Sequence, residues 1–175
     1  MASRWPATTP TGASTPRGKG GLVSTSLRDA GAAFHMALLP DGEILAAGGG
    51  FSTDPQRLVI ARFTSSGKLD GSFGTDGILT SKLSDPFGSI AVQDDGKIVA
   101  EGPSFTLVRF DPDGSLDPGF GANGELTTDL GSGFTSTGFG MGALAIDGGG
   151  DILAGGYASS SKSDSDFALV RYLAT

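Results

Sequence analysis

The sequence predicts an all-β protein made of three tandem copies of one four-stranded unit. A segment centred on an Asp-Gly or Gly-Gly pair occurs three times at equal intervals, beginning at Leu38, Val92 and Ile146. The apolar runs around these segments are short and are bounded by glycine, which favours strands over helices. A chain of 175 residues is also long enough to form one domain with a sizeable core.

Two further markers keep the same order, one in all three copies and the other in the first two. An apolar run ending in Arg and an aromatic residue contains Arg62, Arg109 and Arg171. A Leu-Asp-x-x-Phe-Gly segment begins at Leu69 and again at Leu116. Because three markers keep a constant order, chance similarity does not explain them and the chain is a repeat protein.

Each copy is expected to hold four antiparallel strands. An Asp-Gly pair between two apolar runs is typical of a tight β-hairpin. Four strands per repeat fit one blade of a β-propeller, because each small sheet must cover both of its faces with neighbouring blades. In the first copy the expected strands are residues 36–39, 44–47, 58–63 and 77–83.

The number of strands is uneven at the two ends of the chain. The third copy has no fourth strand after Tyr172, whereas residues 20–27 resemble the fourth strand of a repeat that lacks its first three. Known propellers use about four to eight blades, so three cannot close a ring. We therefore expect a homodimer that forms a six-bladed ring, in which residues 20–27 of each chain complete the third blade of the other. The expected division is a disordered tail or linker at 1–19, the exchanged strand at 20–27, and blades at 34–83, 88–130 and 139–175.

Composition excludes several classes of function. The chain has 12 Lys and Arg against 19 Asp and Glu, and its net charge of −7 disfavours nucleic acid as a partner. No apolar run approaches the roughly 18 residues of a membrane helix, so membrane insertion is not expected. The absence of cysteine excludes disulfides and thiol chemistry.

The second copy resembles a known family of repeats. It reads Leu-Val-Arg-Phe-Asp-x-Asp-Gly-Ser-Leu-Asp-x-x-Phe-Gly-x-x-Gly over residues 107–124, followed by Leu-Thr-Thr-Asp-Leu. This pattern resembles the delta-60 repeat of bacterial secreted and surface proteins, best over residues 88–130. The resemblance implies a propeller-like β-fold and an extracytoplasmic setting, and it implies no catalytic residues.

Candidate ligand-binding residues are expected at one mouth of the central channel. In a propeller the first strand of each blade lines the channel, and the connections that crowd one mouth commonly carry function. Arg28, Asp29 and Asp85 are the candidates on these connections. Residues 158–166, rich in Ser and Asp, are expected to form a mobile loop at the rim of this surface.

His35 and Glu101 are the candidate catalytic and metal-binding residues. Each departs from small residues at the matching positions of the sibling copies, which are Ser89 and Ala143 for His35, and Ala47 and Gly155 for Glu101. With their two-fold mates they could bind a divalent metal such as zinc, manganese or calcium. The alternative is that His35 is a hydrogen-bonded channel residue and Glu101 a solvated loop carboxylate.

Two other polar sets favour structural roles. Asp111, Asp113 and Asp117 resemble part of a calcium loop, but the first copy keeps only the last carboxylate, as Asp70, so a turn explains both copies better. The arginine that recurs in every copy is expected to pair with Asp70 or Asp117.

Two functions remain open from the sequence. The first is a self-assembling module that recognises a small molecule or a protein. The alternative is a small metal-dependent hydrolase of esters, lactones or phosphoesters with its site in the channel, an analogy that rests on fold alone.

Overall fold

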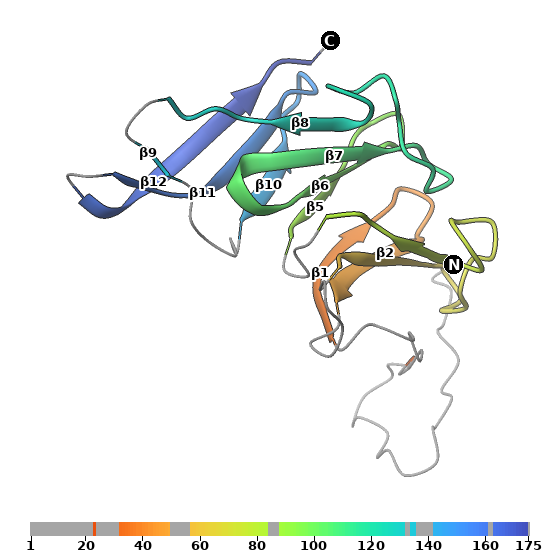
Figure 1. Cartoon of the computed structure of the whole chain (residues 1–175). Coiled ribbons are helices and arrows are strands. Elements are labelled where there is room, and N and C mark those ends of the chain that lie inside the picture. The colour runs from red at the N-terminus through yellow and green to blue at the C-terminus, as the bar shows by residue number, and fades with distance from the viewer. Residues whose placement is uncertain are drawn as a thin grey trace.

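The structure is a computed structural model that describes Val23 and residues 32–49, 57–83, 88–131, 134–135, 142–160 and 163–174. These residues form three four-stranded antiparallel sheets, and the predicted all-β class is confirmed (Figure 1). Their one helical segment is the 3-10 turn Pro103–Phe105. No helix in the described part of the chain could span a membrane.

The first two sheets have strands in chain order, each paired with the next. The first sheet contains β1 (Ala32–Leu38), β2 (Ile44–Gly49), β3 (Val59–Phe63) and β4 (Ile78–Thr80). The second sheet contains β5 (Ile90–Val92), β6 (Ile98–Glu101), β7 (Thr106–Phe110) and β8 (Glu125–Thr127).

The third sheet departs from this order. Three of its strands, β10 (Ala143–Ile146), β11 (Ile152–Ser160) and β12 (Ser163–Tyr172), pair in sequence. Its fourth strand, β9 (Phe134–Thr135), pairs with the far end of β11 instead of with β12. The strand expected at residues 20–27 lies outside the described residues except for Val23, which is in no strand.

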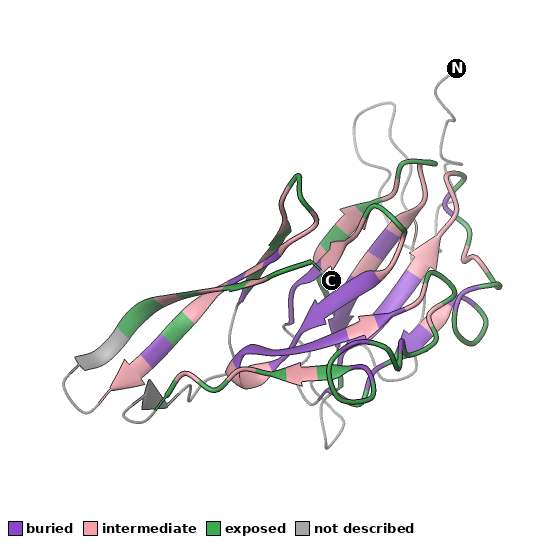
Figure 2. Cartoon of the chain, turned by 90° about the horizontal axis from the view of Figure 1, so that it is seen from above, coloured by how far each residue is buried: buried purple, intermediate pink, exposed green. Residues whose placement is uncertain are grey.

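The expectation of a loop over residues 158–166 is wrong. β11 and β12 remain paired as far as Ala158↔Asp166 and Ser160↔Ser163, so most of this segment is a hairpin that extends beyond the third sheet. The polar composition that suggested a loop is compatible with strands whose faces both meet solvent. Of its residues with a described burial, Ala158 is buried, Ser159 and Ser160 are half-buried, and Asp166 is exposed (Figure 2).

The same turn begins the hairpin of every sheet. The backbone N–H groups of Leu39, Gln93 and Asp147 donate to the carbonyl four residues later, at 2.8, 2.9 and 3.0 Å. The residue that reverses the chain has a φ of +86°, +84° or +87° in the three turns, a left-handed conformation that favours glycine. This explains why Gly42, Gly96 and Gly150 keep the same place in all three copies.

The core consists of two layers of side chains, one between each pair of adjacent sheets. The second sheet lies between the other two (Figure 1). Leu45, Leu58 and Ile60 of the first sheet meet Ile98 and other residues of the second. On the opposite face of the second sheet, Val99 and Leu107 meet Ile152 and other residues of the third.

The register of the strands aligns the three sheets position by position. Ile60, Leu107 and Leu169 pair with Ala47, Glu101 and Gly155, which are themselves equivalent in the repeat. In the same way Met36, Ile90 and Leu144 pair with Ala46, Ala100 and Ala154. Every sheet therefore has two faces that can be named in the same way. The face that carries Ile60, Leu107 and Leu169 is the forward face, and in the first and second sheets it packs on the next sheet. The opposite face is the backward face, and in the second and third sheets it packs on the preceding sheet.

Candidate functional surfaces

The recurring arginine has a structural role in the first two sheets, as predicted. Arg62 Nε donates to Asp70 Oδ2 at 2.7 Å, and its guanidinium lies 4.9 Å from the centre of the Phe73 ring. Arg109 Nε donates to Asp117 Oδ2 at 2.7 Å and lies 4.5 Å from the Phe120 ring. Each pair ties the third strand to the corner segment that follows it.

The third sheet satisfies its arginine differently. Arg171 donates to Asp151 at 2.7 Å and to Asp147 at 2.6 Å, and both acids belong to the first hairpin turn of the same sheet. The backbone N–H of Ala174 and the Arg171 guanidinium lower the pKa of Asp151. The recurring arginine therefore pairs with aspartate in all three sheets, although the aspartates come from different segments.

The carboxylates of Asp111, Asp113 and Asp117 in the second sheet bind groups of the protein itself. Asp113 Oδ1 accepts hydrogen bonds from the N–H and the hydroxyl of Ser115, at 2.8 and 2.7 Å, and these bonds lower the pKa of Asp113. Lys97 pairs with both Asp111 and Asp117. The turn interpretation is confirmed. No group of three potential metal ligands occurs within the described ranges.

His35 and Glu101 lie on opposite sides of the second sheet. His35 in β1 is directly opposite Ala47, which belongs to the core between the first and second sheets. Glu101 in β6 is opposite Leu107, which belongs to the core between the second and third sheets. Because cross-strand partners share a face, the two candidate residues of one chain point into different inter-sheet layers.

Glu101 is only 4% exposed and lies against the third sheet. A Cβ built on Gly142 would lie 2.1 Å from its Oε2, so the carboxylate occupies space that only a glycine leaves free. Nearby, the hydroxyl of Tyr172 bonds to Thr128 and donates to the carbonyl of Phe105 at 3.3 Å. Burial, opposed by the Thr128 bond and reinforced by the charge of Glu101, raises the pKa of Tyr172.

The metal site and catalytic role of His35 and Glu101 remain predictions. Metal analysis of protein purified without chelator would test them, with loss of a stoichiometric metal in a His35→Ala variant as the supporting result. The candidate ligand-binding residues Arg28, Asp29 and Asp85 lie outside the described residues.

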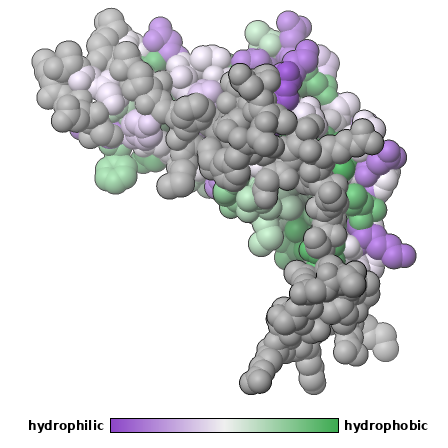
Figure 3. Space-filling model, turned by 60° about the horizontal axis from the view of Figure 1, so that its bottom comes forward, coloured by the Kyte–Doolittle hydropathy of each residue, from purple (hydrophilic) through white to green (hydrophobic). Residues whose placement is uncertain are grey.

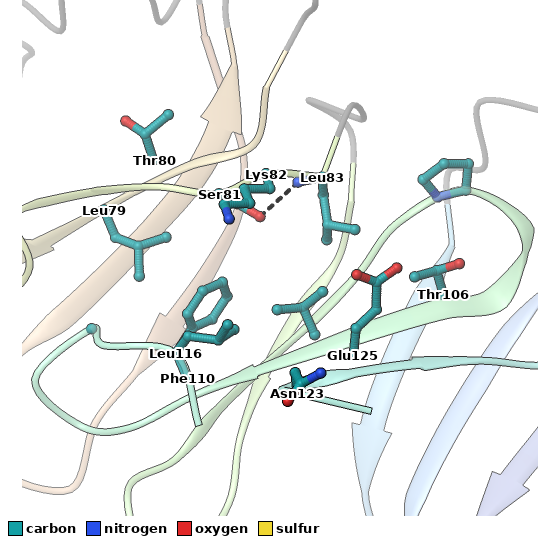
Figure 4. A pocket seen from close by; sticks show the side chains of 13 residues that line it. Leu79, Thr80, Ser81, Lys82, Leu83, Thr106, Phe110, Leu116, Asn123 and Glu125 are labelled. Atoms are coloured by element: carbon teal, nitrogen blue, oxygen red, sulfur yellow. Dashed lines mark hydrogen bonds between the residues drawn. The ribbon is translucent and has the colours of Figure 1, made fainter. Parts of the chain in front are cut away.

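A groove of about 390 Å³ runs between the outer strands of the first two sheets. Figure 4 shows Leu79, Ser81 and Leu83 on one side of it, and Asn123 and Glu125 on the other. Within the first of these walls, the Leu83 N–H donates to Ser81 Oγ at 2.9 Å. Sequence reasoning missed this groove because it is formed by the splay between two sheets and not by a motif.

The two end sheets expose large apolar side chains on their outward faces. Met36 and Leu38 are exposed on β1, and Phe167 and Leu169 on β12. The β12 side also forms a shallow hollow of about 530 Å³ over Gly155 and its neighbours. Figure 3 shows hydrophobic side chains gathered on the surface at the end of the molecule formed by the first sheet.

Comparison with protein families gives one match. Residues 39–73 and 93–120 match the family described as a domain of unknown function (DUF5122), beta-propeller. The two segments lie in the first two repeats and include both Leu-Asp-x-x-Phe-Gly corners through the phenylalanine. The predicted resemblance to a family of β-propeller repeats is confirmed. A search of curated proteins found no match.

Proposed function

Because its first two repeats carry the motif of a β-propeller family, we propose that this chain is half of a six-bladed ring that forms from two copies and serves as a recognition module. The assembly part of the proposal depends on one observation. The forward face of the third sheet and the β1 side of the backward face of the first carry exposed apolar residues, although the equivalent residues of the other sheets are buried or pack against the core.

The forward faces differ in exposure but not in chemistry. Ile60 and Leu107 are 0% exposed, and Leu169 at the same position of the third sheet is 86% exposed. Phe167 corresponds by register to the buried Leu58. Soluble monomers seldom expose a group of large apolar side chains. The forward face of the third sheet therefore resembles a face that another sheet covers.

The backward faces show the same contrast. Ile90 of the second sheet is 7% exposed, whereas its counterpart Met36 in the first sheet is 76% exposed. Leu38 is exposed too, while its counterpart Val92 packs against the core. The β1 side of the first sheet is therefore apolar and uncovered at positions that, in the second sheet, pack against the preceding sheet.

A second copy is the occupant that fits both surfaces. Inside the chain, every forward face packs on a backward face. One chain leaves one face of each kind uncovered, so two chains arranged about a two-fold axis cover all four. Burial of one such side chain stabilises the assembly by up to about 1.5–3 kcal/mol.

Light scattering coupled to size exclusion tests the assembly. We expect twice the chain mass for the wild type and a shift to the monomer mass for Leu169→Asp, since a charge would be buried at the ring contact. Thr127→Asp, an exposed position of β8 in the second sheet and therefore on neither end face, is the matched control and should remain a dimer. A stable, soluble wild-type monomer would overturn the proposal.

The recognition role is supported by the β-propeller match alone, as an inference from fold. Rigid sheets that hold connecting loops at one end suit the binding of ligands. Assays of the purified protein with ester, lactone and phosphoester substrates, with and without added divalent metals, test the non-catalytic reading. Turnover that is lost in a His35→Ala variant would contradict it.

A further inference from the structure

The outer edge of β12 lacks the strand that the other two sheets have at this place. β3 carries β4, and β7 carries β8, on the side away from the first strand of the sheet. Within the described ranges, no strand lies beyond β12. An open strand edge presents unpaired N–H and C=O groups to any segment able to pair with them.

A seven-residue segment near the amino terminus has the sequence of an outer strand. Residues 77–83 read Gly-Ile-Leu-Thr-Ser-Lys-Leu, residues 124–130 read Gly-Glu-Leu-Thr-Thr-Asp-Leu, and residues 21–27 read Gly-Leu-Val-Ser-Thr-Ser-Leu. All three begin with glycine, have an aliphatic residue third and seventh, and have two hydroxyl residues in the middle. The first two segments contain β4 and β8.

We propose that residues 21–27 form the outer strand of the third sheet of a second copy. The inference rests on the proposed assembly and adds to it the strand that the two chains exchange. Val23 is the one residue of this segment that the structure describes.

The register of the exchanged strand follows from the other sheets. Val59 and Thr106 face Thr80 and Thr127, so Ala168 should face Ser24. Ile60 and Leu107 face Leu79 and Leu126, so Leu169 should face Val23. The N–H groups of Arg62 and Arg109 donate to the carbonyls of Gly77 and Gly124, both at 3.0 Å, so the Arg171 N–H should donate to Gly21.

The length of the connection favours exchange over pairing within one chain. Residues 28–31 join the segment to β1, and a fully extended link of that length reaches about 18 Å at most. Within one chain the outer edge of the third sheet lies two sheet spacings and three strand spacings from β1, roughly 24 Å at about 10 and 4.8 Å per spacing. In the ring, the third sheet of the second copy is one sheet spacing away, and the distance falls to roughly 17 Å.

The exchanged strand would also enlarge the ring contact. Leu79, the counterpart of Val23, is 5% exposed and belongs to the core between the first and second sheets. Val23 would therefore lie beside Leu169 on the forward face of the third sheet. The backward face of the first sheet would cover both residues, so strand exchange and face packing support each other.

Disulfide trapping tests the exchange directly, because the chain has no cysteine of its own. Ser24→Cys and Ala168→Cys proteins are mixed, oxidised and run on a non-reducing gel. The counterpart pairs are non-hydrogen-bonded cross-strand partners, with Cα atoms about 4.5 Å apart, within the range that a disulfide spans. We expect a covalent heterodimer from the mixture and little from either protein alone.

The control keeps Ala168→Cys and moves the other cysteine by one residue, as Thr25→Cys. Side chains of adjacent strand residues point to opposite faces, so this mixture should cross-link at least tenfold less. No cross-link in a mixture that light scattering shows to be dimeric would overturn the exchange and leave the assembly intact. A disulfide that forms only within single chains of the double variant would also overturn it, and a monomeric wild type would remove both proposals.

Discussion

The second and third sheets use nearly the same third strand in different surroundings. Leu107, Val108 and Arg109 in β7 are repeated as Leu169, Val170 and Arg171 in β12. The second sheet adds an outer strand and a corner that hold the arginine, whose side chain is 17% exposed, whereas that of Arg171 is 57% exposed. Equivalent residues of two repeats therefore differ in burial according to whether an outer strand and a corner segment follow and cover them.

The largest difference is expected between Leu107 and Leu169. Leu107→Ala leaves a cavity between two sheets and should lower the free energy of unfolding by about 2–5 kcal/mol. Leu169→Ala should change the stability of the monomeric form by less than about 0.5 kcal/mol, because the side chain is exposed there. Urea unfolding of both variants at a protein concentration low enough to keep the chain monomeric measures the contrast, and equal losses would contradict it.

The acidic partners of the two arginines should differ by a smaller amount. Asp117→Ala removes a 7% exposed carboxylate that binds Arg109 and Lys97, and should cost about 1.5–3 kcal/mol. Asp147→Ala affects the exposed Arg171, which keeps Asp151, and should cost about 0–1 kcal/mol. Thermal unfolding checks the order, and a larger loss for Asp147→Ala would reverse the comparison.

Acid should destabilise the corner of the second sheet through Asp117. The Lys97 hydrogen bond is the main cause that lowers the pKa of Asp117 below its ordinary value. A lowered pKa in the folded state stabilises the protein above about pH 4, the unfolded value, and the contribution disappears as pH falls through the folded pKa. The wild-type unfolding temperature should therefore fall below about pH 4, and Asp117→Asn should fall less steeply.

Leu107→Ala is the control for this pH profile. It destabilises the fold without removing a titratable group, so its unfolding temperature should run parallel to that of the wild type. An Asp117→Asn profile that also runs parallel would show that Asp117 does not contribute to the acid response.

The smallest effects are expected in the hairpin turns. Gly96→Ala in the second sheet places a Cβ at a φ of +84° and should cost about 1–2 kcal/mol. Gly148→Ala in the third sheet meets nothing within 4 Å and should change stability by less than about 0.5 kcal/mol. Denaturant unfolding measures both variants, and equal losses of unfolding free energy for Gly96→Ala and Gly148→Ala would contradict this expectation.

The candidate site could be predicted only in part. Repeat comparison identified the arginine and aspartate pairs correctly, because both partners recur at constant spacing. It also singled out Glu101 as unusual, but not that the carboxylate lies buried against Gly142. The two residues come from different repeats, and no local pattern reports the distance between them.

The sequence by itself determined the all-β class, the repeat, and the hairpin turns, because strand length and the need for glycine at positive φ are local properties. Only the tertiary structure decided that β9 pairs with β11, that the β11 and β12 hairpin extends through residues 158–166, and that His35 and Glu101 point into different layers. These features depend on which face of one sheet meets the next. That choice is made by packing between distant segments, and a repeat that looks the same in each copy does not specify it.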